Sequence, residues 1–292
     1  MPTAIADLPV IEAIRWEPDS SDALLVDAAA LTDWLVLFLR DECIRRRGSR
    51  RAVVGVSGGV DSAVTAFLCA RAFSAENTHA FLLPYRVSSP ESLEHGRLVA
   101  ETLGAPWREI DITPMVDGYV QQFEPDASPR RVGNVCARCR TAILFDQSAK
   151  LPGLPIGTGN KTERLFGYFT WHADDAPPIN PLGDLYKTQV RQLAEYLGVP
   201  EVIRRKPPTA DLVHGQTDEG DLGITYEEAD RILYYLVQGW SPEALVERGF
   251  RVGAVEVVRQ RVAATHWKRR LPTVAMVSAT AIGEFYLRPV DY

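Results

Sequence analysis

The stretch AVVGV at residues 52–56 runs directly into SGGVDS at residues 57–62. The first part is apolar and rich in β-branched residues, which predicts a buried strand of a parallel sheet. The second part predicts a tight glycine-rich turn that opens a helix, where backbone N–H groups point at a bound anion. The Ser57 and Ser62 hydroxyls would add two donors. The stretch therefore predicts an α/β fold with a loop that holds a pyrophosphate-sized group.

This loop differs from the common nucleotide-triphosphate loop GxxxxGK[ST], because it lacks the lysine and carries an acid, Asp61. A carboxylate beside phosphates indicates a bridging metal ion. SGGVDS resembles the signature of the ATP pyrophosphatase superfamily, whose members cleave ATP between the α and β phosphates and adenylate a carboxyl or carbonyl oxygen. The alternative is a glycine-rich turn without a ligand, which would suit an isolated SGG triplet better than the full string.

Apolar runs and helical periodicities alternate along the first two thirds of the chain. This order favours parallel strands joined by right-handed crossovers, and ligands bind at the carboxyl ends of such strands. We therefore expect a doubly wound, Rossmann-like parallel sheet flanked by helices, with helical additions at both ends of the chain. The expected strands span 52–56, 78–84, 107–112 and 154–157, and the expected helices span 24–47, 62–73, 90–103, about 136–150 and 185–197, with more from near Tyr226.

Several segments lack periodicity and are rich in turn-forming residues. Residues 1–22 predict an extended arm, which leaves residues 23–292 as a single domain. We expect a mobile loop at 124–134 and irregular chain at 171–183 and 206–223. The string GTGNKTERLFGYF lies between the first two of these flexible segments.

Composition limits the class of protein. The chain has 292 residues, 46% of them hydrophobic, and its net charge of −6 argues against broad nucleic-acid binding. No run approaches about 18 apolar residues and no leader sequence is visible, so we expect a soluble cytoplasmic protein that does not contact a membrane. The four cysteines are too few for a disulfide framework and are expected to be reduced thiols.

Further strings follow in a fixed order over roughly residues 24–272, and with them the chain resembles the ammonia-dependent NAD synthetases, most closely their archaeal-type branch. The strings after residue 150 separate that family from other ATP pyrophosphatases, which share only the first one. They are SGGVDSA at 57–63, GNVCARCR at 133–140, GTGNKTE at 157–163, GYFT at 167–170, PLGDLYKTQVRQLAEYLGVP at 181–200 and KPPTADLVHGQTDEGDLGITYEE at 206–228.

The resemblance implies an enzyme that amidates the nicotinic acid ring of deamido-NAD. ATP first adenylates the ring carboxylate and releases pyrophosphate, and ammonia then displaces AMP. Glutamine-dependent relatives carry an amidase domain ahead of the loop, whereas 56 residues precede Ser57 here, so free ammonia is the expected nitrogen donor. A separate glutaminase partner stays open. Because the relatives are homodimers whose dinucleotide site draws on both subunits, we expect a homodimer.

The resemblance also implies roles around ATP. Asp61 and Glu163 match two acidic ligands of Mg²⁺, the expected cofactor, and this hard ion prefers oxygen ligands. Asp61 and Lys187 are expected to act in catalysis, although each acid alone could be a solvated surface group and Lys187 an exposed helix lysine. The implied ATP-binding residues are Ser57, Gly58, Gly59, Asp61, Ser62, Arg138, Thr158, Lys187 and Thr209.

A second group of residues is implied to bind deamido-NAD. An arginine offers a rigid fork of donors, and an aromatic face can stack on the pyridine ring. Asp174 is the third residue expected to act in catalysis, where it would orient ammonia or receive a proton from ammonium. Ion pairing on a helix and core packing stay open as alternatives for the arginines and the aromatic residues. The group comprises Arg140, Tyr168, Phe169, Trp171, Asp174 and Lys268.

Two rival functions remain. Cys136 and Cys139 form a CxxC, and sulfur-transferring ATP pyrophosphatases use the same phosphate loop with cysteines that carry a persulfide or a cluster. A CxxC without a third cysteine nearby is a weak metal or cluster signal. The other rival is a nucleotide-binding sensor on the same fold, which would require broken metal ligands, whereas Asp61 and Glu163 are both present.

Overall fold

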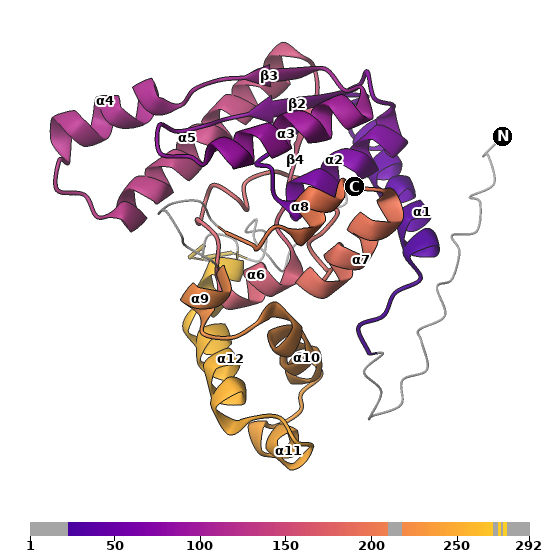
Figure 1. Cartoon of the computed structure of the whole chain (residues 1–292), viewed down its shortest axis with the longest axis vertical. Helices are drawn as coiled ribbons and strands as arrows, with labels where there is room; N and C mark the ends of the chain where they lie inside the picture. The colour runs from indigo at the N-terminus through magenta and orange to yellow at the C-terminus, as the bar shows by residue number, and fades with distance from the viewer. Residues whose placement is uncertain (1–22, 210–217, 271–273, 276, 279–292) are drawn as a thin grey trace.

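The computed structural model describes residues 23–209, 218–270, 274–275 and 277–278; the expected arm at 1–22 and part of the irregular segment at 206–223 lie outside them. At its centre is a sheet of four parallel strands in the order β3-β2-β1-β4 (Figure 1). The strands are β1 (Ala52–Gly55), β2 (Thr78–Leu82), β3 (Trp107–Glu109) and β4 (Leu154–Ile156).

The strand order reverses between β1 and β4. After β1 the chain adds β2 and β3 on one side, and β4 pairs with the other side, so that Val54 lies opposite both Ala80 and Ile156. In open α/β sheets, ligands bind beyond the carboxyl ends of the strands at such a switch point. The phosphate loop after β1 and the turn after β4 both start at this place in the sheet.

Helices cover both faces of the sheet, which confirms the doubly wound α/β fold. One face carries α1 (Ala28–Leu39), α2 (Val60–Phe73), α3 (Pro90–Leu103) and α7 (Lys187–Leu197). The other face carries α4 (Thr113–Phe123) and α5 (Pro129–Lys150). Within the described ranges, no helix is long and apolar enough to cross a lipid bilayer.

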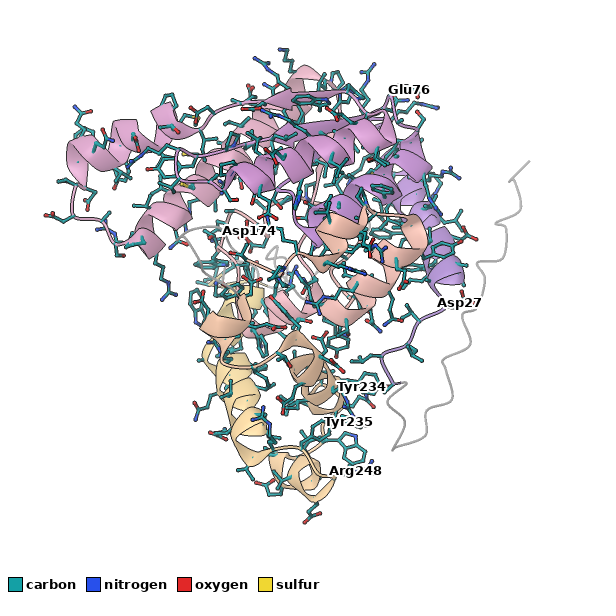
Figure 2. The ribbon with its side chains drawn as sticks, in the orientation of Figure 1. Asp27, Glu76, Asp174, Tyr234, Tyr235 and Arg248 are labelled. Carbon is teal, nitrogen blue, oxygen red and sulfur yellow. The ribbon has the colours of Figure 1, made fainter. Side chains whose placement is uncertain are left out.

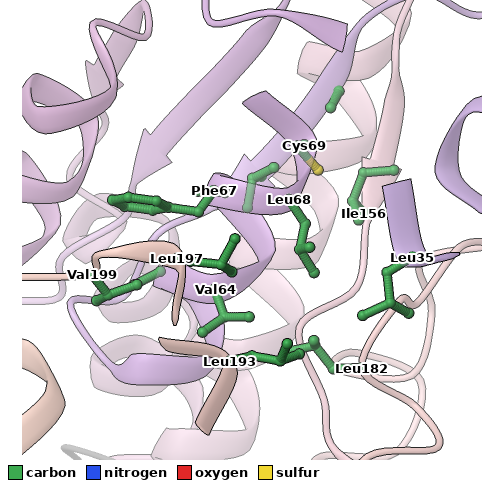
Figure 3. Packing of buried hydrophobic residues seen from close by; sticks show 14 of the residues in the cluster. Leu35, Val64, Phe67, Leu68, Cys69, Ile156, Leu182, Leu193, Leu197 and Val199 are labelled. Carbon is green, nitrogen blue, oxygen red and sulfur yellow. The ribbon is translucent and has the colours of Figure 1, made fainter. Parts of the chain in front are cut away.

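Strand β1 is buried on both sides, as its apolar sequence requires. Its side chains alternate, because Val54 belongs to the cluster under α2 and α7, whereas Val53 belongs to the cluster under α4 and α5. Figure 3 shows the first cluster, in which Val64 and Leu68 of α2 lie between the sheet and Leu193 of α7. This packing fixes the start of α2, and with it the phosphate loop.

The C-terminal helices form a lobe below the sheet (Figure 1) with a hydrophobic cluster of its own. Aromatic rings are frequent in it: Tyr235 lies 5.5 Å from Tyr234, 5.6 Å from Trp240 and 5.7 Å from Phe250 between ring centroids (Figure 2). The expectation of a single domain over residues 23–292 stays a prediction. The lobe and its connection to the sheet comprise α6 (Lys161–Phe166), α9 (Asp218–Leu222), α10 (Tyr226–Leu236), α11 (Pro242–Glu247), α12 (Val252–Ala264) and a 3₁₀ turn, His266–Arg269. Helix α8 (Glu201–Arg205) instead lies beside α7, and its Ile203 packs in the cluster under α2 and α7.

The expected loop at 124–134 is wrong over its second half. Helix α5 begins at Pro129, whose fixed φ suits the first helical position, so the arginines at 130 and 131 are helical. The segment 113–123, for which no element was predicted, is helix α4.

The expected first helix begins later than position 24. Asp27 caps α1 by accepting hydrogen bonds from the N–H groups of Ala29 and Ala30, each at 3.0 Å, so the helix starts at Ala28. It ends in a π-helical turn, Arg40–Arg45. The strands expected at 78–84 and 107–112 are also shorter than expected and end at Leu82 and Glu109.

Leu193→Ala should lower the free energy of unfolding by about 2–5 kcal/mol, because it leaves a cavity between α7 and α2. Leu193 is fully buried, whereas Val202 on α8 is 48% exposed, so Val202→Ala should change stability by less than about 0.5 kcal/mol. Urea denaturation followed by circular dichroism measures both values. Equal stabilities of the two variants would contradict the packing described here.

Candidate active site

The phosphate loop depends on one glycine in a left-handed conformation. Gly58 has φ +79°, and a Cβ built on it would lie 2.1 Å from the carbonyl oxygen of Ser92 in α3. No L side chain fits there. The backbone at position 58 therefore lies directly against α3, and the loop passes over the start of that helix.

Two serine hydroxyls hold the loop in shape. The N–H of Ser57 donates to Ser62 Oγ at 3.1 Å, and Ser62 Oγ donates to the carbonyl of Gly59 at 3.0 Å. The two hydroxyl oxygens are themselves 3.1 Å apart. Ser62 is 3% exposed, so its first task is to close the turn, while Ser57 and Gly59 line the cavity.

The buried ammonium of Lys187 lies between the two predicted metal ligands. Its Nζ makes an ion pair with Asp61 Oδ2 and lies 3.2 Å from Glu163 Oε1. The Lys187 side chain is 3% exposed, and those of Asp61 and Glu163 are 16% and 19% exposed. Asp61 lies in the first turn of α2, Glu163 in the first turn of α6, and Lys187 begins α7, so the site joins three helix N-termini.

Burial and mutual charge set the protonation of this group. Burial raises the pKa of Glu163 to about 7, a shift that the neighbouring Lys187 opposes and Asp61 reinforces. Burial alone would lower the pKa of Lys187, but the charges of Asp61 and Glu163 outweigh it and raise that pKa. Lys187 therefore stays protonated, and the pKa of the Glu163 carboxyl lies closer to neutral pH than that of an ordinary glutamate.

Asn160 orients both acids. Its Nδ2 donates to Asp61 Oδ1 at 2.9 Å, while its Oδ1 caps α6 by accepting the N–H of Glu163 at 2.9 Å. Asn160 is fully buried. Asn160 was not among the predicted site residues, although the spacing Asn-x-x-Glu is that of a capping box and could have identified it.

The buried carboxylate of Asp230 helps to fix the backbone at the start of α7, where Lys187 lies. Asp230 of α10 accepts hydrogen bonds from the Thr162 hydroxyl at 2.5 Å and from the N–H of Thr188 at 2.8 Å. Thr162 Oγ1 in turn accepts the N–H of Lys187 at 3.0 Å. The first two N–H groups of α7 thus find partners on α6 and α10. No short-range sequence signal marks Asp230, because its partners lie 42 and 68 residues away.

A third acid, Asp218, lies close to the group and was also missed. It is 5% exposed, and its oxygens accept hydrogen bonds from the hydroxyls of Tyr226 at 3.0 Å and Tyr168 at 3.1 Å. Lys187 Nζ lies 5.2 Å from the centre of the Tyr226 ring. Tyr168 is therefore anchored at its hydroxyl end while its ring borders the cavity.

A cavity of about 390 Å³ lies under the carboxyl ends of β1, β2 and β4, and Asp61, Asn160, Glu163, Lys187 and Asp218 are among the residues that line it. Most of the predicted site residues come together there. They are Ser57, Gly59, Asp61, Ser62, Thr158, Lys187 and Thr209 of the expected ATP site, Glu163 of the expected metal site, and Arg140, Tyr168, Phe169 and Asp174 of the expected deamido-NAD site. Asp174 lies below the sheet beside the cavity (Figure 2).

Four predicted residues do not line the cavity and instead support its walls. Gly58 is turned toward α3, and Arg138 Nη2 donates to the carbonyl of Trp171 at 3.1 Å. The Trp171 ring packs edge-on against Trp267 with centroids 5.1 Å apart. Lys268 donates to the carbonyls of Gly167, at 2.6 Å, and of Phe169. Their assignment to ATP or deamido-NAD binding stays a prediction.

Comparison with known proteins bears directly on this site. The model of the family described as NAD synthase matches residues 31–272. The chain belongs to this family. It is 51% identical over 249 residues to a protein of Trichlorobacter lovleyi named NH(3)-dependent NAD(+) synthetase, covering 85% of this chain and 90% of that one. A protein of the same name from Wolinella succinogenes is 44% identical over 254 residues, or 87% and 98% of the two chains.

Solved structures of NAD synthase relatives share the architecture. The NH3-dependent NAD synthetase from Campylobacter jejuni in complex with the nitrate ion aligns with a TM-score of 0.73 at 30% identity, covering 86% of this chain and all of that one. An NMN synthetase from Francisella tularensis aligns with a TM-score of 0.77 at 30% identity, covering 86% and 99%.

The CxxC of this NAD synthase family member lies on α5, away from the Asp61 and Lys187 group. Cys136 is 2% exposed and packs in the cluster under α4 and α5, and Cys139 packs against the same cluster. Burial raises the pKa of both thiols. Since the thiolate is the reactive form, the sulfur-transfer alternative is not favoured.

Thr162→Val should lower the free energy of unfolding by about 1–3 kcal/mol, because it leaves the buried N–H of Lys187 and an oxygen of Asp230 without a partner. Thr162→Ser keeps the hydroxyl and serves as the control, with a smaller loss. Guanidinium denaturation measures both variants. Equal stability of the two variants would show that the hydroxyl does not join α6, α7 and α10.

The titration of Glu163 should appear in the stability of the protein. Its pKa is raised on folding, so the folded state binds the extra proton and stability falls as pH rises from 4.5 through about 7. Glu163→Gln removes this dependence. Both proteins are measured in metal-free buffers across this range. The unfolding free energy of the wild type should therefore fall relative to that of Glu163→Gln as the pH rises. A difference that does not change with pH would contradict the raised pKa.

Proposed function

We propose that this protein is an ammonia-dependent NAD synthetase, which uses ATP to convert the carboxylate of deamido-NAD into the amide of NAD. The observation that carries the proposal is the placement of Asp61, Glu163 and Lys187 beside the phosphate loop, at the wall of one cavity. Membership of the NAD synthase family supports the same reaction.

The chain's own residues bring two reactants into line. The backbone at Ser57 and Gly59 and the start of α2 hold the triphosphate, so that its α-phosphorus faces the ring carboxylate across the cavity. A carboxylate oxygen attacks this phosphorus, the bond to the β phosphate breaks, and AMP stays on the ring carboxylate as pyrophosphate leaves along the loop. Ammonia then attacks the activated carbon and AMP departs.

The acid pair fits the Mg²⁺ that we propose as cofactor. Asp61 and Glu163 offer hard oxygen donors from two helices, and Mg²⁺ is commonly held by one or two carboxylates together with substrate phosphates and waters. Bound there, the ion would neutralise charge on the phosphates during attack. Lys187 already offsets one of the two negative charges, and Asn160 donates to both carboxylates, from its side chain to Asp61 and from its backbone N–H to Glu163.

The other end of the cavity suits the dinucleotide. Arg140 is held by the carbonyl of Leu83, to which its Nε donates at 2.9 Å, and its side chain lines the cavity, where the guanidinium can donate to a ligand. Tyr168 and Phe169 present rings, and Asp174 lies near them, where it can accept a proton from ammonium. Lys268 reaches back to the Phe169 carbonyl and sets this aromatic wall. We also propose a homodimer, on the family resemblance alone.

The purified protein should form NAD from deamido-NAD, ATP, Mg²⁺ and ammonium, with one AMP and one pyrophosphate released per amide. Asp61→Asn should lower turnover at least about 100-fold, because the Mg²⁺ proposed to stabilise the charge that develops on the phosphates would lose a carboxylate ligand. Asp33→Asn on the outer side of α1 is the control and should match wild type. Liquid chromatography of the nucleotides provides the measurement.

Alternative substrates test which nitrogen donor and which nucleotide the protein uses. Glutamine in place of ammonium should give no product, and nicotinate mononucleotide in place of deamido-NAD should give much less. A preference for the mononucleotide would reassign the substrate, and it would then match the name of the Francisella tularensis relative. Binding of ATP without release of pyrophosphate under any of these conditions would favour a sensor.

A further inference from the structure

Lys206 directly follows α8 and reaches the start of α3, which packs against the phosphate loop. Its Nζ donates to Ser92 Oγ at 2.9 Å, and both residues line the cavity. Ser92 is also the residue whose carbonyl oxygen lies against Gly58. Ser92 thus lies between the Lys206 ammonium and the loop that follows β1, and it contacts both.

The charges around the loop make this lysine different from Lys187. The Lys187 ammonium pairs with both Asp61 and Glu163, so two carboxylates surround one positive charge. Lys206 has no ion-pair partner among the residues that the structure describes, and its bond goes to a neutral hydroxyl. The Mg²⁺ proposed at Asp61 and Glu163 would neutralise part of the charge of a bound triphosphate, and Lys206 can supply further positive charge for its outer phosphates.

The neighbouring histidine does not share this task. His95 is 6% exposed and contacts the loop, since its Cβ would lie 3.1 Å from a Cβ at Gly58. Burial and the nearby Lys206 lower the pKa of His95, against a weaker opposite effect of Glu91 and Glu94. The imidazole is therefore neutral at physiological pH, and the positive charge on this wall belongs to Lys206.

We propose that Lys206, oriented by Ser92, binds the β and γ phosphates of ATP together with the loop residues Ser57 and Gly59 and retains the departing pyrophosphate. This deepens the proposed function and rests on it. Lysine acts here as a point charge, the manner in which it commonly binds phosphate. As the bond between the α and β phosphates breaks, negative charge grows on the leaving group, and a cation already in place stabilises it. Lys206 stays protonated and forms no covalent bond.

Binding of inorganic pyrophosphate tests this directly. Isothermal titration with pyrophosphate and Mg²⁺ should give an at least about tenfold weaker dissociation constant for Lys206→Gln than for wild type, because a charge-assisted hydrogen bond is lost. Lys206→Arg, which keeps the charge, should recover most of the affinity. AMP, which lacks the two outer phosphates, should bind wild type and Lys206→Gln within about twofold of each other.

Arg205→Gln is the matched control. Arg205 precedes Lys206, is 80% exposed at its side chain and pairs with Glu201, so its removal changes the net charge equally without touching the cavity. It should leave pyrophosphate binding within about twofold of wild type. Melting temperatures of the variants verify that each is folded.

Four results would overturn the inference: a pyrophosphate affinity of Lys206→Gln equal to that of wild type, an equal loss of affinity in Arg205→Gln, an equal loss for AMP and pyrophosphate, or failure of the wild type to bind pyrophosphate. The proposed function has a separate test, because a wild type that forms no NAD but binds pyrophosphate through Lys206 would refute the amidation and keep the anion site.

Discussion

The site depends on a buried ammonium held between two carboxylates. Removing Lys187, Asp61 and Glu163 from water costs free energy, which only close pairing and further hydrogen bonds offset. Asn160 provides such bonds to the acids, and the Thr162 and Asp230 pair anchors the backbone of the lysine. Because α2, α6 and α7 each supply one charged member, the ion group also fixes the positions of these helices relative to one another.

The sheet supplies the rigid frame on which this group is built. Strands β1 and β4 end side by side at the point where the strand order reverses, so the loops that follow them carry Asp61 and Asn160 to one place. The clusters on both faces of β1 hold that point in position. The C-terminal lobe adds Asp218 and Asp230 from below, and it therefore contributes to the polar network as well as to the hydrophobic packing.

The features that depend on residues close together in the sequence could be predicted from it. The run 52–62 was sufficient for the strand, the turn and the helix, and Asp61 and Glu163 were recognised because each sits in a short motif at a helix start. Helix α4 was missed because Met115 and Tyr119 are apolar yet exposed while Val116 and Val120 are buried, which hides the helical period.

Other residues could not be found from the sequence at all. Asp230 and Lys206 enter the site through contacts that span 42 to 114 residues, so only the folded arrangement of α8 and α10 reveals them. Arg138 donates to the Trp171 backbone, a contact that its helix motif did not reveal, and its expected role at ATP stays a prediction.

Position 58 has a consequence for how this loop can vary. The carbonyl oxygen of Ser92 occupies the space where any chiral residue would place its first side-chain carbon. Substitution there cannot be accommodated by a rotamer change, because the obstacle is main chain on a packed helix. Residue changes in this loop are therefore expected at the positions next to Gly58 and not at Gly58 itself. The backbone of α3 thus limits the shape that the anion-binding loop can take.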